Sequence, residues 1–153
     1  MRRGRPRVAA RGARARAHPL RLLTRLPLTR GARRLVYALL AVGLLAAIVV
    51  QYARHDVGWW PPVAFGLGPD VALLFGAGRG LERGQLHPRA VPLYNALHRF
   101  WGPLALAVLA VAAGLPAAWL VGALAWAAHV AVDRAVGYGL RTRDGFQRPD
   151  RSG

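Results

Sequence analysis

The stretch that decides the fold is the apolar block "FWGPLALAVLAVAAGLPAAWLVGALAWAAHVAV", residues 100–132. A helix needs ~20 apolar residues to cross ~30 Å of hydrocarbon, so this block is too long for one crossing and slightly short for two. Gly114 and Pro116 divide it, because neither residue favours a helix interior. Both halves gain length from their polar ends, and we therefore expect one helix over about 92–113 and another over about 116–138.

Two further apolar stretches precede this block. Residues 35–53 are long enough to span a bilayer, and residues 58–78 are long enough as well. The second stretch opens with tryptophans, which suit a membrane interface, and its Gly-Leu-Gly-Pro run before Asp70 predicts a kink. Alanine and glycine are dense near the C-terminus and favour close helix packing. The sequence thus predicts an all-α membrane protein, a bundle of about four transmembrane helices.

The composition agrees with a lipid environment. The chain is 54% hydrophobic, its 22 basic residues are all arginine, and its formal net charge is +16. Beside long apolar runs, this charge favours a bilayer with anionic headgroups as partner. We expect no nucleic acid, because no aromatic residues interleave with the arginines of residues 1–34. The absence of cysteine excludes disulfides and Cys-ligated zinc.

Arginine placement predicts the orientation. More than half of the arginines lie in residues 1–34, which we expect to be an N-terminal extension that is disordered or lies on the membrane surface. With both termini cytoplasmic, Arg54 is the only arginine left outside, and residues 141–153 form a short basic cytoplasmic tail. Preference for arginine over lysine is typical of GC-rich bacterial genomes, so we expect a multi-pass protein of the bacterial plasma membrane. Helices with small-residue faces fit a monomer or half of a homodimer equally.

This topology brings four ionisable side chains to one leaflet. A charge in the apolar layer costs ~3 kcal/mol, so such residues normally face the bundle interior and a partner. His129 and Asp133 are four residues apart and share a helix face. Two imidazoles and two carboxylates could bind zinc or another divalent metal. The expected metal ligands are Asp70, His98, His129 and Asp133, and the wider polar cluster adds Tyr94, Asn95 and Arg134.

The residues leave three functional interpretations open. The favoured one is a structural or accessory membrane protein, because buried polar clusters often hold a bundle together. The first alternative is a metal-dependent membrane hydrolase that uses the four expected ligands. The second is a small proton- or ion-coupled carrier. A shared metal site requires the four side chains to lie within roughly 10 Å of one another.

Several motifs resemble a known family. These are "PD" at 69–70, "LYNALH" at 93–98 and "WAAHVAVDRAVGYGLR" at 126–141, followed by "GF" at 145–146. In order and spacing they are similar to the small bacterial integral membrane proteins of domain-of-unknown-function family 4260. The resemblance implies a fold but no established activity. The signature positions that it implies are Asp70, Tyr94, Asn95, His98, His129, Asp133, Arg134, Gly137, Tyr138 and Gly139.

Overall fold

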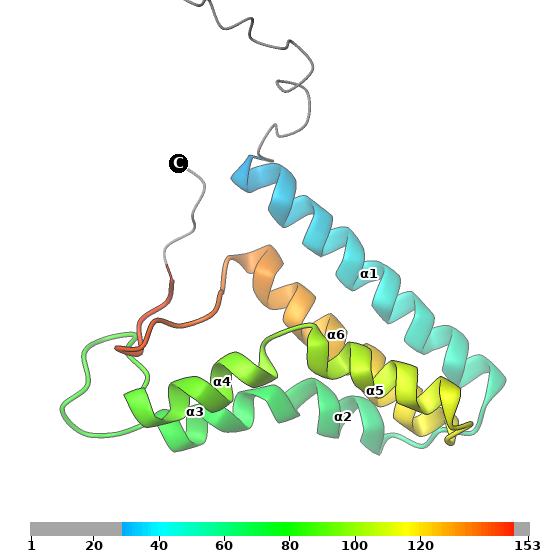
Figure 1. Ribbon diagram of the computed structural model, residues 1–153. Coiled ribbons are helices and arrows are strands. Elements are labelled where there is room, and N and C mark those ends of the chain that lie inside the picture. Colours follow the sequence, from blue (N-terminus) through cyan, green and yellow to red (C-terminus); the bar gives the residue numbers. More distant parts are fainter. Residues whose placement is uncertain (1–28, 149–153) are drawn as a thin grey trace, which may run out of the picture.

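The computed structural model describes residues 29–148, and this part of the chain is helical, apart from loops and one isolated β-bridge (Figure 1). All-helical architecture was expected. The α-helices are α1 (Arg30–Arg54), α2 (Trp60–Leu67), α3 (Val71–Gly76), α4 (Val91–Leu97), α5 (Trp101–Ala112) and α6 (Ala117–Val136). Two 3₁₀ turns, η2 (Gly68–Asp70) and η3 (Pro88–Ala90), precede α3 and α4 respectively.

The first helix begins earlier than the apolar pattern indicates. The predicted N-terminal extension lies mostly outside the described residues, but its last part, 30–34, is helical, so the first helix starts at Arg30 and not near residue 35. Thr29 sets the actual start, because its Oγ1 accepts a hydrogen bond from the backbone N–H of Ala32 at 3.2 Å. Arginine is a good helix former, and α1 therefore extends through the charged residues.

The second and third predicted helices are each interrupted. Residues 60–76 form α2, η2 and α3 in succession, with the expected kink realised as the 3₁₀ turn that ends at Asp70. Residues 91–112 form α4 and α5, separated at 98–100, and an unbroken helix over 92–113 is therefore wrong. Pro103 explains this second break, because a proline lacks the N–H and crowds the carbonyl four residues before it, here that of Arg99.

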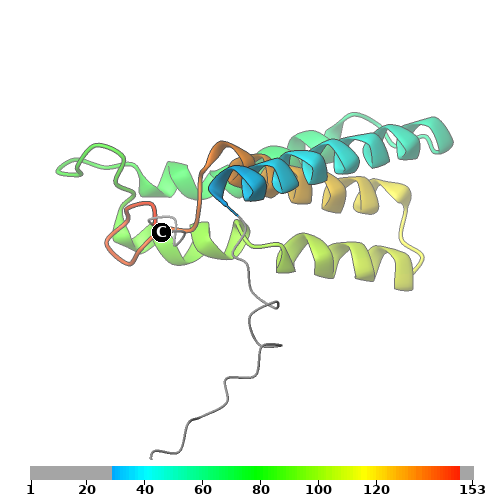
Figure 2. The same ribbon diagram turned by 90° about the horizontal axis from the view of Figure 1, so that it is seen from above.

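Helix α6 lies at the centre of the bundle. It packs against α1, α2 and α5, and Figure 2 shows it between α1 and α5. Small residues allow this close packing: Gly122 faces the Phe65 ring of α2, while Ala123, Ala125 and Ala128 are buried. The helix ends at Gly137, whose φ of 100° is the left-handed cap that glycine adopts without strain. The predicted helix end near residue 138 therefore shifts to Val136.

The outer surface of the bundle is strongly apolar. Helices α1 and α6 are long and apolar enough to cross a membrane. On α1, Leu39 is 63% exposed and Val49 is 66% exposed, and many large apolar side chains of α2, α3 and α5 are exposed as well. Soluble monomers rarely expose apolar patches larger than a few hundred Å². This surface therefore fits a lipid environment.

A polar cap covers the end of the bundle at which α6 finishes. The loop between α3 and α4 meets the C-terminal segment 138–148 there, and the backbone N–H of Leu86 donates to the carbonyl of Gly145 at 3.0 Å. Gly145 has a φ of 93°, and a Cβ at this position would overlap the backbone of Leu86. The opposite end of the bundle carries the turns between α1 and α2 and between α5 and α6 (Figure 1).

We expect Gly122→Ala to lower the free energy of unfolding by about 1–3 kcal/mol, because its Cβ would lie 2.5 Å from the Phe65 ring. Gly43→Ala is the matched control, since a Cβ there meets nothing within 4 Å and alanine favours a helix. Thermal unfolding of both variants in detergent measures the difference. Equal midpoints would contradict tight packing between α2 and α6.

Candidate metal centre

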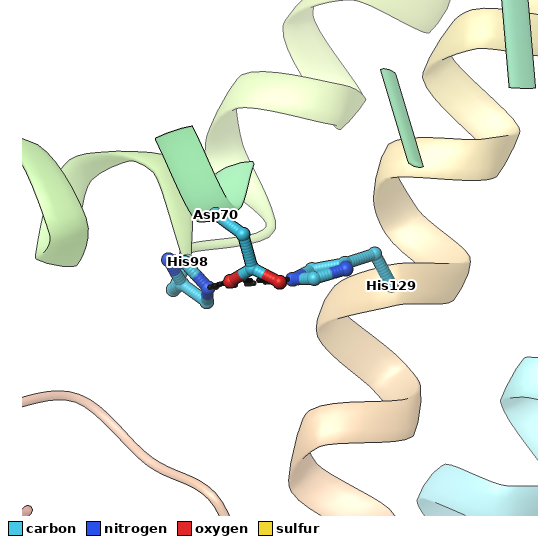
Figure 3. A group of neighbouring side chains, drawn as sticks. All are labelled: Asp70, His98 and His129. Atoms are coloured by element: carbon cyan, nitrogen blue, oxygen red, sulfur yellow. Dashed lines mark hydrogen bonds and ion pairs between the residues drawn. The ribbon is translucent and has the colours of Figure 1, made fainter. Parts of the chain in front are cut away.

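Four polar side chains from three elements meet beside α6. Asp70 ends η2, His98 follows the last residue of α4, and His129 and Asp133 lie one turn apart on α6. Both helix interruptions thus supply a residue to this cluster. Figure 3 shows the Asp70 carboxylate between the two imidazole rings.

The interatomic distances within the cluster fall in a narrow range. His98 Nε2 lies 3.4 Å from Asp70 Oδ1, 3.5 Å from Asp133 Oδ2 and 3.3 Å from His129 Nε2. His129 Nε2 lies 3.7 Å from each of the same two carboxylate oxygens. The structure therefore brings together all four side chains expected as metal ligands, well within the roughly 10 Å that a shared site allows.

The hydrogen bonds of His98 determine which of its nitrogens carries the proton. Its Nδ1 lies 2.9 Å from the carbonyl oxygen of Tyr94, and a carbonyl can only accept, so Nδ1–H is the donor. In the neutral ring Nε2 then presents a lone pair, and this lone pair faces two carboxylates and a second imidazole. Metal-bound histidines are typically held in this way, by a backbone carbonyl on the other ring nitrogen.

The spacing of the cluster atoms suits a tetrahedral metal ion. In a tetrahedron the ligand–ligand distance is about 1.6 times the bond length, which gives roughly 3.3–3.4 Å for zinc bonded to nitrogen and oxygen. One atom each of Asp70, His98 and His129 can be chosen so that all three lie within 4.8 Å of one another. Asp133 adds a carboxylate oxygen close to both imidazoles. The donor set can hold a divalent ion with three or four protein ligands.

Burial within the cluster is graded. The side chain of His98 is 0% exposed, that of His129 is 14% and that of Asp133 is 18%, whereas that of Asp70 is 45%. The Asp70 side is therefore the accessible side of the cluster.

Tyr94 and Asn95 support the cluster from α4. The Tyr94 ring stacks on the imidazole of His98, with centroids 3.8 Å apart and an interplanar angle of 16°. The Asn95 amide makes two hydrogen bonds with the backbone of Arg141. Its Nδ2 donates to the carbonyl at 3.0 Å, and its Oδ1 accepts from the N–H at 2.7 Å. These contacts fix the ring of His98 and attach the C-terminal segment to α4.

Arg134 completes the expected polar cluster. Its Nη2 donates to the carbonyl of His98 at 2.8 Å, and its Nη1 donates to the carbonyl of Tyr138 at 2.9 Å. The first contact pairs a carbonyl that the break between α4 and α5 releases from helical hydrogen bonding. Arg134 therefore stabilises the backbone conformation that points His98 into the bundle.

Two supporting residues were missed by the sequence reasoning. Trp126 Nε1 donates to the carbonyl of Leu97 at 2.7 Å, and Arg141 lies 5.0 Å from the centre of the Tyr94 ring. The position of Trp126, three residues before His129 on α6, was a usable signal, since such residues share a helix face. Arg141 was assigned to the tail, and its contact with Tyr94 follows only from the folded C-terminal segment.

Over residues 29–148 the fold is helical, with a partly buried His/Asp cluster and two helices apolar enough to cross a membrane. The family described as "Domain of unknown function (DUF4260)" matches residues 35–150, most of the chain. The chain therefore belongs to this family, as the sequence motifs indicated. Searches of curated proteins and of solved structures gave no match.

Proposed function

We propose that this chain is a membrane-embedded metal-dependent hydrolase, with a divalent ion such as zinc bound by Asp70, His98 and His129. The observation that carries the proposal is the buried Nε2 lone pair of His98, which faces two carboxylate oxygens at 3.4–3.5 Å and Nε2 of His129 at 3.3 Å. An imidazole lone pair and two carboxylates in such proximity repel one another unless a proton or a metal ion lies between them.

A bound metal ion explains the contacts better than a proton does. A proton added to His98 lies between Nε2 and one acceptor, whereas a metal ion attracts the imidazole nitrogens and the carboxylate oxygens of the cluster at once. The near-equal distances, 3.3–3.7 Å, favour a common centre over a single ion pair. This is why the geometry favours a metal centre over the purely structural pairing that the sequence suggested first.

Asp133 would serve as the general base in this proposal. A divalent ion held by Asp70, His98 and His129 would supply Lewis acidity that makes a water molecule more acidic. Asp133 lies beside the two imidazoles, where it could accept a proton from that water and then deliver it to the leaving oxygen of a membrane-proximal ester as the ester bond breaks and the water oxygen takes its place. The exposed side of Asp70 provides access for the substrate.

In the proposed topology, the chain crosses the bacterial plasma membrane four times, with both termini cytoplasmic. The crossings would be α1, the segment 60–76, the segment 91–112 and α6. Apolar side chains exposed along these elements support this topology, as does the gathering of arginines at one end of the bundle. Helix breaks within the membrane are tolerated because neighbouring side chains, here Arg134 and Trp126, pair the released carbonyls.

The first test is metal content. We expect the purified wild-type protein to retain about one zinc ion per chain, and His98→Ala, His129→Ala and Asp70→Ala each to lower zinc affinity at least about tenfold, because each removes a ligand. His55→Ala is the control, since this histidine is exposed and follows α1 at the opposite end of the bundle. Elemental analysis after dialysis measures the content. A wild-type protein that binds no zinc would exclude the proposed site.

The second test separates the catalytic centre from a closed structural one. We expect Asp133→Asn to keep zinc but to slow hydrolysis by about 100-fold or more, because the amide cannot take up the proton. The probes are p-nitrophenyl butyrate and bis-p-nitrophenyl phosphate in detergent micelles. Zinc loss in Asp133→Asn would instead identify Asp133 as a fourth ligand, as in a structural site.

The third test is the topology. The natural chain has no cysteine, so single cysteines report position without a background. We expect a membrane-impermeant maleimide to label Asp56→Cys in intact cells and Arg83→Cys only after lysis, because these residues lie in loops at opposite ends of the bundle. Labelling of both variants in intact cells would overturn the proposed orientation.

A further inference from the structure

A small apolar pocket lies between the end of α2 with η2, the end of α4, and α6. Its volume is about 230 Å³. The lining residues are Ala64, Phe65, Gly68, Pro69, Leu97 and Trp126. None of these described residues has an ionisable side chain, and none is a proposed metal ligand. The pocket therefore differs in chemistry from the His/Asp cluster.

The pocket and the cluster are neighbours in the fold. Pro69 and Leu97 each directly precede a proposed metal ligand in the chain, and consecutive Cα atoms are only about 3.8 Å apart. Trp126 lies one turn before His129 on α6 and shares its helix face. Each of the three proposed ligands thus has a neighbour in the pocket wall. A molecule that occupies the pocket therefore lies beside the cluster.

Packing holds the two aromatic walls of the pocket in place. The Phe65 ring lies over Gly122, where a Cβ would overlap it, and meets the Trp119 ring edge to face with centroids 6.1 Å apart. The indole of Trp126 lies over Gly102 in the same way. Its Nε1–H already donates to a backbone carbonyl of α4 at 2.7 Å. The pocket is therefore preformed, and its indole N–H is paired within the protein.

These properties select an apolar and slender occupant. With its indole N–H paired, the pocket gains affinity chiefly by burying carbon. Sites for drug-sized ligands have volumes of ~300–1,000 Å³, so this smaller pocket suits a single alkyl chain better than a ring system. A Cβ at Gly68 would meet nothing within 4 Å, which leaves open space for a chain at this wall. At ~30 Å³ for a group the size of water or methylene, about seven or eight carbons fit.

We propose that this pocket binds a linear acyl chain whose carbonyl end points to the His/Asp cluster. The substrate of the site is then a carboxylic ester with an acyl chain of about eight carbons. The chain lies among apolar side chains and the ester group lies at the polar cluster, so both parts meet surroundings of matching polarity. The identification of a substrate rests on the proposed hydrolase function, whereas binding of the chain does not.

The test has two readouts, and the first is the chain-length dependence of hydrolysis. The probes are p-nitrophenyl acetate and p-nitrophenyl octanoate, with the full-length protein in digitonin, a detergent without an alkyl chain. We expect Ala64→Phe to lower the octanoate-to-acetate ratio of kcat/KM about tenfold or more, because the added ring displaces several methylenes, each worth about fourfold. Ala105→Phe is the matched control: it adds the same ring to an exposed alanine of α5 outside the pocket, so the ratio should change less than about twofold.

The second readout needs neither metal nor turnover. Octanoic acid with a terminal diazirine is irradiated with the same protein, and mass spectrometry locates the label. We expect label in the tryptic fragments 55–79 and 90–99, which contain five of the six lining residues, and its removal by excess octanoate. Ala64→Phe should lower this labelling about fivefold or more, whereas Ala105→Phe should leave it unchanged.

The outcomes separate this inference from the proposed function. Pocket labelling with a lowered ratio in Ala64→Phe supports the inference. Pocket labelling in a protein that hydrolyses neither ester supports the chain site and overturns the hydrolase. Labelling spread over the apolar surface, an unchanged ratio in Ala64→Phe, or an equal change in Ala105→Phe overturns the inference and leaves the hydrolase standing. Thermal unfolding midpoints close to that of the wild type show that both variants are folded.

Discussion

The fully buried imidazole of His98 connects the elements on which the rest of the structure depends. Its Nδ1–H is paired within α4, its ring is stacked on Tyr94, and its Nε2 meets side chains from η2 and α6. In a continuous helix over 91–112, the His98 carbonyl would accept a helical hydrogen bond and would not be available to Arg134. Pro103 prevents such a continuous helix. The break is therefore part of the site, because it orients both the backbone and the ring of this residue.

Close packing by small residues makes the cluster possible. The side chains of Asp70 and His98 approach α6 because Gly122 and its neighbouring alanines let α2 and α5 pack tightly against it. The central position of α6 then places His129 and Asp133 between elements that are distant in sequence. Charged groups in such an environment need partners, and the four side chains supply them to one another or to a shared cation.

Arg134 connects the His/Asp cluster with the segment that follows α6. Its Nη2 donates to the carbonyl of His98, and its Nη1 donates to the carbonyl of Tyr138. One side chain therefore holds both the break between α4 and α5 and the turn after α6.

Much of the fold and part of the candidate site follow from the sequence. The lengths of the apolar stretches indicate the helical segments, and the four-residue spacing of His129 and Asp133 puts them on one face. These properties depend on near neighbours in the chain. The hydrogen bond from Trp126 to the carbonyl of Leu97, the contact of Arg141 with the Tyr94 ring, and the packing of Arg34 on Gly137 were decided by the tertiary structure. They depend on which faces of distant elements pack together, and no local pattern of residues contains that information.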